Sequence, residues 1–189
     1  DQGMARELLG LPLGKRLLLF GALNVTDKRK GIDYLIEALR RMEKQDVELV
    51  VFGQVKDDIR GLFPVPIHSM GYLSDESKIV ALYNAVDMFI TSSLEENLPN
   101  TIMESMACGT PCVGFEIGGI PEMIDHRVNG YVANYKDAGD LANGIQWVLE
   151  HEDRLALSDA CVKKVQENYT EEVVAKQYTA LYEKLLKGE

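Results

Sequence analysis

The sequence lacks any apolar run of 18 or more residues, the length that a membrane-spanning helix needs. Basic residues are also scarce, because 20 Lys and Arg stand against 30 Asp and Glu and leave a net charge of −10. Non-specific binding of nucleic acid needs a basic face, which a chain of this charge does not favour. We therefore expect neither a membrane span nor a nucleic-acid partner.

Cysteine is rare as well, with Cys108, Cys112 and Cys161 as the three thiols. The first two are separated by three residues, a spacing that fits no common zinc motif, and no histidine lies near them in the sequence. We expect small buried thiols in a reducing cytoplasm and no metal site. No secretory signal is visible, and the polar first residues, DQGMARELLGLPLGKR, are typical of a mid-chain segment, so we expect a domain of a longer protein.

The sequence does contain an alternation of apolar runs and helical patterns over 189 residues, a length that suits one α/β domain. Continuous apolar runs predict buried strands at 16–23, 47–53, 65–71, 86–93 and 111–115, with a strand or extended arm at 129–135. Helical spacing and polar flanks predict helices at 31–43, 75–85, 101–108, 118–124, 137–150, 152–169 and 171–188. The pattern indicates a doubly wound parallel sheet with helices on both faces.

Polar residues precede three of these helices, and we expect Ser74, Asn100 and Thr170 to cap them. The last helix is amphipathic, and the apolar residues near one side of it are Val173, Tyr178, Leu181 and Leu185. We expect that side to pack on this domain or on a domain outside this chain.

Ligands of an open parallel sheet bind beyond the carboxyl ends of its strands. Four predicted loops leave such ends and should converge on one rim, at 21–31, 68–74, 92–100 and 115–122. The first loop carries Lys28, Arg29 and Lys30 just before a helix, where free N–H groups and a cation favour a phosphate; the alternative is a solvated charged loop. The loop contains neither Gly-x-Gly-x-x-Gly nor a P-loop, so it supports neither a dehydrogenase nor an NTPase.

Glu96 and Glu104 lie on either side of the start of a short predicted helix. Ionised carboxylates accept paired hydrogen bonds, which suits the vicinal hydroxyls of a sugar, whereas free amides at a helix start near Asn100 suit phosphate oxygens. The arrangement suggests a ligand with a sugar at each end of a diphosphate; the alternative is two exposed acidic residues. The Gly118-Gly119 pair allows either close approach of a ligand to the backbone or a plain tight turn.

Several stretches, in this order, carry a family resemblance: RKGIDYLIEAL, GYLSDESKIVALYNAVDMFITSS, EENLPNTIMESMACGTPCV, GGIPEMI and NGYV. Together they resemble the retaining nucleotide-sugar glycosyltransferases of the large family-four group (group 1). More narrowly, they are similar to the C-terminal, donor-binding, Rossmann-like half of the two-domain GT-B fold. The resemblance covers nearly the whole chain, and its most specific motif is Glu-x7-Glu, here Glu96 to Glu104, with MACGTP behind it.

The resemblance implies a role for each matching residue. Glu96 would be the catalytic residue, contacting donor-sugar hydroxyls and steadying positive charge at the anomeric carbon, while Glu104 would hold the ribose hydroxyls. Lys30 would bind the diphosphate. The other contacts to the sugar and diphosphate would come from Arg29, Asn24, Asn97, Leu98, Asn100 and Thr101. The base would lie against Met70, Gly71, Tyr72 and Leu73, unless this loop is only a turn with a core tyrosine. Catalysis in the family needs no metal and no cofactor, which agrees with the lack of an Asp-x-Asp motif here.

Two departures from the family pattern matter. An arginine usually stands beside the phosphate-binding lysine, shortly after the first strand, whereas this chain has Ala22 or Asn24 there. Arg29, Asn24 or the N-terminal half of the enzyme would have to replace it. The usual EGFG turn reads ENLPN here, and Pro99 removes one backbone N–H donor from it.

A GT-B enzyme also needs an N-terminal acceptor-binding domain, which residues 1–189 do not include. We expect the whole of this chain to form the donor-binding domain, to bind a nucleoside-diphosphate sugar, and to turn over little or none alone. The intact enzyme would move a hexose to the hydroxyl of a saccharide or lipid-linked acceptor with retained configuration. The product would be a polysaccharide, a lipopolysaccharide or a glycolipid. The expected location is the cytoplasm, with a peripheral contact of the intact enzyme at the inner face of the membrane.

Two other kinds of protein stay open on sequence grounds. One is a GT-B-type epimerase or phosphorylase domain. The other is a non-catalytic α/β interaction domain, which would ignore nucleotides. The sequence also leaves open the base (uridine, guanosine or adenosine), the donor sugar, the linkage and the oligomeric state.

Overall fold

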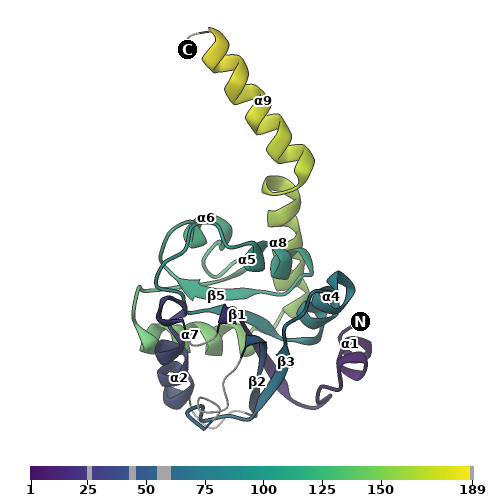
Figure 1. The fold of residues 1–189 in the computed structure, drawn as a ribbon, viewed down its shortest axis with the longest axis vertical. Coiled ribbons are helices and arrows are strands. Elements are labelled where there is room, and N and C mark those ends of the chain that lie inside the picture. The colour runs from purple at the N-terminus through teal and green to yellow at the C-terminus, as the bar shows by residue number, and fades with distance from the viewer. Residues whose placement is uncertain (25–26, 43–45, 55–60, 188–189) are drawn as a thin grey trace.

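The computed structural model describes residues 1–24, 27–42, 46–54 and 61–187 (Figure 1). Its elements, in chain order, are α1 (Gln2–Leu9), β1 (Arg16–Asn24), the 3-10 turn η1 (Lys28–Lys30), α2 (Ile32–Arg41), β2 (Val47–Gln54), β3 (Ile67–Gly71), α4 (Glu76–Ala85), β4 (Met88–Thr91), α5 (Asn100–Ala107), β5 (Cys112–Phe115), α6 (Ile120–Met123), β6 (Gly130–Ala133), α7 (Ala138–Leu149), α8 (Arg154–Asn168) and α9 (Glu171–Lys187).

Within the described residues, six strands form one sheet in the order β3-β2-β1-β4-β5-β6, and every neighbouring pair is parallel. The predicted doubly wound parallel sheet is therefore confirmed. Residues 129–135, for which the sequence allowed either a strand or an extended arm, contain strand β6. The strand expected from residue 65 begins at Ile67, because Pro66 has no N–H to give to the ladder and contributes only its carbonyl, which accepts from the N–H of Leu49 at 2.9 Å.

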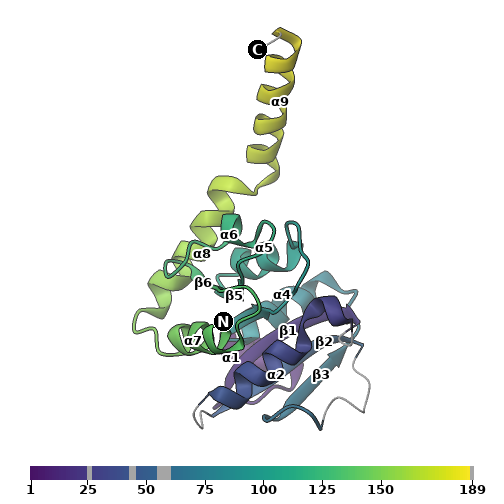
Figure 2. The ribbon, with the colours of Figure 1, turned by 90° about the vertical axis from the view of Figure 1, so that its left-hand side faces the viewer.

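Alternate side chains of each strand face opposite sides of the sheet, where different helices cover them (Figure 2). Leu18 and Phe20 of β1 pack in a cluster with α2 and α7, whereas Leu17 and Leu19 pack with α1, α4, α5 and α8. Each of these four β1 side chains is at most 1% exposed, so its burial contributes about 1.5–3 kcal/mol. The continuous apolar run that predicted this strand is thus explained by helices on both faces.

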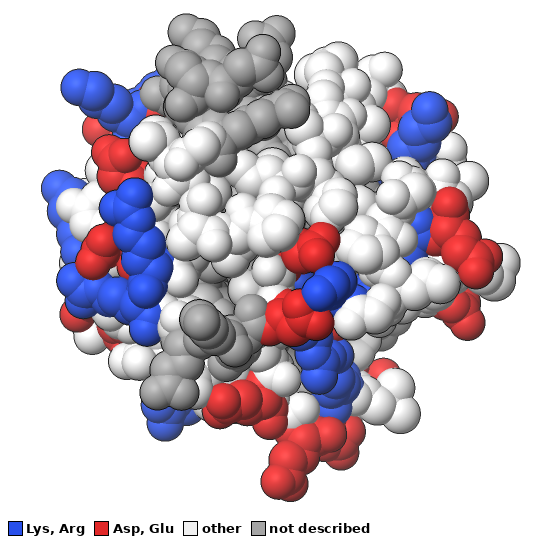
Figure 3. Space-filling model, turned by 90° about the horizontal axis from the view of Figure 1, so that it is seen from below, with Lys and Arg blue, Asp and Glu red and all other residues white. Residues whose placement is uncertain are grey.

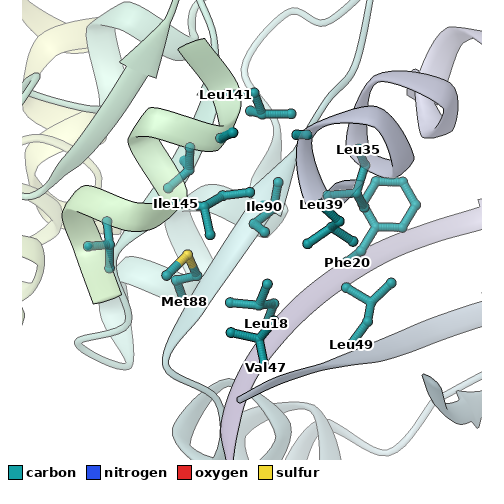
Figure 4. Close-up of a cluster of buried hydrophobic side chains, with 14 of the residues drawn as sticks. Leu18, Phe20, Leu35, Leu39, Val47, Leu49, Met88, Ile90, Leu141 and Ile145 are labelled. Carbon is teal, nitrogen blue, oxygen red and sulfur yellow. The ribbon is translucent and has the colours of Figure 1, made fainter. Parts of the chain in front are cut away.

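The first of the two clusters lies between the sheet and the helices α2 and α7 (Figure 4). Leu35 and Leu39 reach it from α2, and Leu141 and Ile145 reach it from α7. Contacts between α2 and α7 themselves close this layer. The layer fixes the start of α2, and with it the loop that leads from β1 into that helix.

The helices at the two ends of the chain were not anticipated correctly. Residues 2–9 form α1, capped by Asp1, whose side chain accepts from the N–H of Met4 at 3.2 Å. At the other end, α9 extends away from the sheet and buries none of its side chains (Figures 1 and 2). Of the two alternatives for this helix, packing on this domain is therefore wrong, because the described chain contacts α9 mainly at its junction with α8. Packing on a domain outside this chain stays a prediction. The large apolar side chains that it leaves exposed are Tyr178, Leu181, Tyr182, Leu185 and Leu186.

Of the three predicted caps, that of Thr170 is confirmed, because its Oγ1 accepts from the N–H of Val173 at 3.4 Å. The cap at Ser74 is wrong, since the carboxylate of Asp75, one residue later, accepts from the N–H of Ser77 at 3.0 Å. The cap at Asn100 is also wrong: Pro99 holds that position and Asn100 is the first helical residue, so α5 begins without a side-chain cap.

Charged side chains are mixed on the face of the molecule shown in Figure 3. Lys and Arg lie beside Asp and Glu around an uncharged centre, and the part of this face that is described carries no extended basic patch. No helix in the described ranges is both long and apolar enough to cross a membrane.

Candidate functional site at the centre of the sheet

The site lies where β1 and β4 end side by side at the centre of the sheet. The chain continues from β1 toward β2 and β3 on one side, and from β4 toward β5 and β6 on the other. Such a reversal of strand order separates the loops that follow and opens a crevice at the carboxyl ends. A pocket of about 470 Å³ lies there, which we call the switch-point pocket. Its lining residues are Gly21, Lys30, Phe52, Phe89, Thr91, Glu96, Leu98, Pro99, Asn100 and Thr101.

Lys30 is placed in this pocket by hydrogen bonds between its own loop and the loop after β4. The N–H of Leu94 donates to the carbonyl of Arg29 at 2.7 Å, and the hydroxyl of Ser92 donates to the carbonyl of Lys30 at 2.9 Å. Gly31 follows with a φ of 61°, and a Cβ there would lie 1.9 Å from the carbonyl oxygen of Ser92. Only glycine permits this approach, so the RKG sequence serves to press Lys30 against the end of β4.

Lys30 and Glu96 form an ion pair, with Nζ 2.6 Å from Oε1. The side chain of Glu96 is 15% exposed and that of Lys30 is 33% exposed, so the pair is half-buried and open to the pocket. The cation expected to bind phosphate and the carboxylate expected to bind sugar hydroxyls therefore stand in contact. An incoming diphosphate would compete with Glu96 for the ammonium group.

The turn that carries Glu96 is held by the Gly118-Gly119 pair. The N–H of Gly119 donates to the carbonyl of Asn97 at 2.6 Å, and a Cβ on Gly118 would lie 2.0 Å from the carbonyl oxygen of Glu96. The sequence left open a close approach of a ligand or a plain tight turn at these glycines. In the structure, it is the backbone of Glu96 and Asn97 that approaches them closely. The loop after β5 thus positions the loop after β4.

The first turn of α5 contributes backbone donors to the pocket. Asn100 and Thr101 both line it, and the helix has no side-chain cap that would occupy their N–H groups. The first N–H groups of a helix have no partner within the helix, and the helix dipole makes them attractive to anions. Leu98 lies half-exposed at the same edge, while Asn97 lines an adjoining hollow of about 390 Å³ together with Arg29, Lys30, Glu95 and Glu96.

Glu104 lies farther along α5 and is held by a tyrosine that the sequence did not single out. The hydroxyl of Tyr83, on α4, donates to Oε2 of Glu104 at 3.0 Å. The Tyr83 residue is only 1% exposed, whereas Glu104 is exposed. Burial, and after it the charge of Glu104, raise the pKa of Tyr83 well above its usual value. The sequence gives little indication of this role, because Tyr83 is one of several large residues on the apolar side of the helix α4.

The loop predicted to hold the base is not among the residues that line the switch-point pocket. Met70 and Leu73 pack partly buried against the second core cluster, and Tyr72 is 69% exposed rather than a core tyrosine. The loop begins next to the pocket, however, because Gly71 is paired with Phe52 in the β2–β3 ladder. Phe52, inside a buried strand, gave no sequence signal as a pocket residue.

Arg29, one candidate to replace the missing arginine, is paired with a carboxylate of its own loop. Arg29 makes a two-pronged contact with Asp27, with Nη2 2.7 Å from Oδ2 and Nε 3.2 Å from Oδ1. This contact, with the hydrogen bond from the Arg29 N–H, lowers the pKa of Asp27 to about 2. Asn24 ends β1, but its side chain lies outside the described residues, as does that of Ala22.

None of the three cysteines lines the switch-point pocket. Cys112 and Cys161 are buried as predicted, whereas Cys108 is only half-buried. Burial raises the pKa of Cys112 to about 12 and also raises that of Cys161. In the described ranges, no group of three His, Cys, Asp or Glu side chains comes together in a way that could hold a metal ion.

Comparison with known proteins identifies the family to which this architecture belongs. The family model of the group 1 glycosyl transferases matches residues 14–151. A D-inositol 3-phosphate glycosyltransferase of Mycolicibacterium smegmatis is 35% identical over 159 residues, which cover 78% of this chain and 36% of that protein. The matches to curated relatives cover 31% to 51% of the length of those proteins, so the chain spans about half of them or less.

Solved structures agree in fold. Sucrose-phosphate synthase from Thermosynechococcus elongatus superimposes with a TM-score of 0.79 at 25% identity, over 98% of this chain and 49% of that one. Anabaena HepE, in its complex with UDP-glucose, gives a TM-score of 0.77 at 24% identity, over 97% of this chain and 52% of that one. Because the family pattern is matched from the start of β1 to the end of α7, this chain belongs to the group 1 glycosyl transferases.

Proposed function

We propose that this chain is the donor-binding half of a retaining glycosyltransferase that takes a hexose from a nucleoside-diphosphate sugar. The observation that carries the proposal is the switch-point pocket, where Lys30, Glu96 and the first amides of α5 meet. Lys30 and the amides of Asn100 and Thr101 would take the diphosphate oxygens. The two carboxylates would take hydroxyls at opposite ends of the ligand, the hexose at Glu96 and the ribose at Glu104.

The chemistry follows from the charge that develops during transfer. As the bond from the anomeric carbon to the diphosphate breaks, the sugar becomes positive and the leaving group gains negative charge. Glu96 stabilises the sugar, and Lys30, released from Glu96 by the diphosphate, stabilises the leaving group. Arg29 and Asn97 line the adjoining hollow and are proposed to add contacts there. No metal is required in this scheme, because the cation and the helix amides supply the positive field.

The acceptor belongs to the part of the intact enzyme that this chain does not include. We propose an N-terminal domain of comparable size that binds a saccharide or lipid-linked acceptor and closes the pocket. The exposed apolar side of α9, with Tyr178, Leu181 and Leu185, is then covered by that domain. Relatives named for transfer to a diphospho-undecaprenol-linked sugar and for amylovoran biosynthesis support a saccharide or lipid-linked acceptor.

Calorimetric titration of this chain with UDP, GDP and ADP tests the proposal. UDP is the first probe, because HepE, which shares the fold, is known in complex with UDP-glucose. We expect one diphosphate to bind, and we expect Lys30→Met to weaken it by about tenfold or more, as expected for loss of a charged hydrogen bond. Lys28→Met is the matched control, since Lys28 is exposed in the same turn and its loss should change affinity by less than about twofold. Binding of none of the three, or equal losses in both lysine variants, would contradict the proposal.

A further inference from the structure

Tyr83 is the one fully buried side chain described here that makes a hydrogen bond to either carboxylate of the Glu-x7-Glu motif. Its hydroxyl lies 3.0 Å from Oε2 of Glu104, and this bond joins the hydrophobic core to the exposed rim. Glu104 sits in the second turn of α5, a helix otherwise made of small and apolar side chains. A glutamate at an exposed position normally samples several rotamers. Here one of its two oxygens has a fixed donor.

The tyrosine ring cannot shift easily. Its neighbours Phe52 and Phe89 contact it edge-to-face, with ring centroids 6.4 Å and 6.1 Å away. The hydroxyl of Thr110 donates to the backbone carbonyl of Tyr83 at 2.8 Å, and the hydroxyl of Ser105 donates to the carbonyl of Thr110 at 3.1 Å. These bonds tie α4 to the end of α5. They set the distance between Tyr83 and Glu104 from both helices.

In the hydrogen bond between Tyr83 and Glu104, the proton belongs to the tyrosine hydroxyl. Burial and the negative charge of Glu104 raise the pKa of Tyr83, so the phenol stays protonated at neutral pH and acts as the donor. A carboxylate offers about four acceptor positions on two oxygens. With one of these taken by Tyr83, Oε1 and the remaining position on Oε2 are left for two further donors. Two neighbouring hydroxyl groups on one sugar ring supply such a pair of donors.

We propose that Tyr83 is a positioning residue that fixes the carboxylate of Glu104 for the two hydroxyls of a ribose and so makes the site select ribonucleotides over deoxyribonucleotides. The inference rests on the proposed function, because it takes Glu104 as the ribose-binding residue. Tyr83 itself touches no ligand. Its effect should therefore appear only with ligands that carry both hydroxyls.

The test compares UDP with 2′-deoxy-UDP by calorimetry, on the wild-type chain and on Tyr83→Phe. If the wild type prefers guanosine or adenosine, GDP or ADP and the matching 2′-deoxy diphosphate are the probes. The wild type should bind the ribose form about tenfold more tightly than the deoxyribose form. Tyr83→Phe keeps the ring and its contacts, and we expect it to lose most of that preference by weakening UDP while leaving 2′-deoxy-UDP nearly unchanged.

Tyr131→Phe is the matched control. The hydroxyl of Tyr131 also donates to a carboxylate, Oδ1 of Asp140 at 2.9 Å, but neither residue lines the switch-point pocket. This variant should keep the ribose preference even if it lowers the melting temperature. Thermal melts of all three proteins separate loss of stability from loss of preference.

Each outcome decides between readings. Equal weakening of UDP and 2′-deoxy-UDP in Tyr83→Phe overturns the proposal in favour of a general structural role. If Tyr83→Phe keeps the full preference for UDP over 2′-deoxy-UDP, the proposal is overturned, because the Tyr83 hydroxyl then has no effect on ribose binding. A wild type that binds both diphosphates without a ribose preference removes Glu104 as a ribose ligand, and Tyr83 with it, but leaves diphosphate binding intact. A wild type that binds none of the diphosphates fails at the proposed function instead.

Discussion

The neighbouring strands β1 and β4 carry charged clusters at both ends, and the two clusters are built in opposite ways. At the amino end, Asp87 accepts from three arginines: Arg6 at 3.0 Å, Arg154 at 2.8 Å and Arg16 at 3.4 Å. It also accepts from the backbone N–H of Leu17 at 2.7 Å. We call these four charged residues the Asp87 cluster. At the carboxyl end, Lys30 and Glu96 have a single ion pair between them.

Burial and saturation separate the two ends. The Asp87 side chain is 2% exposed and its acceptor positions are filled, and Arg6 donates in addition to the carbonyl of Ala85 at 2.7 Å. Lys30 and Glu96 are half-buried beside a pocket, and each has hydrogen-bonding capacity to spare. A saturated, buried cluster holds the strands in register and has nothing to offer a ligand. An unsaturated, accessible pair can exchange partners, and this is what a binding site needs.

The largest effect on stability should come from a substitution in the buried Asp87 cluster, whose acceptor positions are filled. Asp87→Ala leaves three arginines, one of them buried, without their shared counter-charge, and we expect it to lower the free energy of unfolding by about 3–5 kcal/mol. Urea denaturation followed by circular dichroism measures this. Arg16→Ala is the control, because Arg16 is 46% exposed and holds the longest of the three contacts, so its loss should cost less than about 1 kcal/mol. Similar losses in both variants would show that the cluster is not centred on Asp87.

The next effect should come from Gly31, which joins the site to the end of β4. A Cβ at this position would combine a positive φ with an overlap on the carbonyl of Ser92, so we expect Gly31→Ala to cost about 2–4 kcal/mol of stability. Gly10→Ala is a matched control, since Gly10 has a φ of 65° but nothing within 4 Å of its Cβ position, and it should cost only about 1–2 kcal/mol. Both values come from denaturant melts. Equal costs would mean that the loop moves aside freely and that Lys30 is not held by this contact.

The sheet could be predicted from the sequence, because strands that are covered by helices on both faces are short continuous apolar runs, such as residues 17–20 of β1. The sequence was not enough for α1, whose polar composition hides that Ala5 and Arg6 are buried against α4 and Asp87. The cap of α4 was misplaced by one residue, since Ser74 and Asp75 are both good caps and only the backbone decides between them. The free position of α9 could not be predicted, because an amphipathic pattern shows a buried side but not which partner buries it.

The site shows the same division between local pattern and three-dimensional contact. Lys30 and Glu96 could be singled out because each stands in a loop after a predicted strand, and the structure brings them into contact. Tyr83, Phe52 and the role of Gly118 could not be found, because each acts through a neighbour distant in sequence. Arg29 was a candidate for a phosphate ligand because of its charge and its place just before a helix, and only the structure shows that Asp27 holds it.

A smaller effect, with opposite signs on binding and turnover, should come from Glu96→Gln. The amide keeps the shape of the side chain but loses the charge that competes with a diphosphate for Lys30. We expect UDP, which has no hexose, to bind this chain about three- to fivefold more tightly than the wild type does. In the intact enzyme, the same change should slow glycosyl transfer by about a hundredfold, because the developing positive charge on the sugar loses its partner.

Calorimetry on this chain and initial rates on the intact enzyme give the two numbers for Glu96→Gln. Glu95→Gln is the control, because Glu95 is exposed in the same turn and forms no described ion pair with Lys30. It should leave both quantities nearly unchanged. A Glu96→Gln variant that binds UDP more weakly would show that Glu96 supports the phosphate site instead of competing with a ligand for it.

The smallest effect should come from Arg29, whose partner Asp27 lies at the surface with its side chain 28% exposed. Arg29→Gln removes the contact that lowers the pKa of Asp27, so that pKa should rise from about 2 toward its ordinary value of 3.8. A carboxyl group with a lowered pKa in the folded state contributes stability above pH 4 that is lost as the pH falls toward 2, so only acid stability in that window should decrease. NMR titration of the Asp27 carboxyl carbon measures the shift, with Lys28→Gln as control.

Because Asp27 already holds the guanidinium, we also expect Arg29→Gln to change UDP affinity far less than Lys30→Met does. A loss as large as that of Lys30→Met would mean that Arg29 leaves Asp27 for the diphosphate and replaces the arginine that this chain lacks after β1.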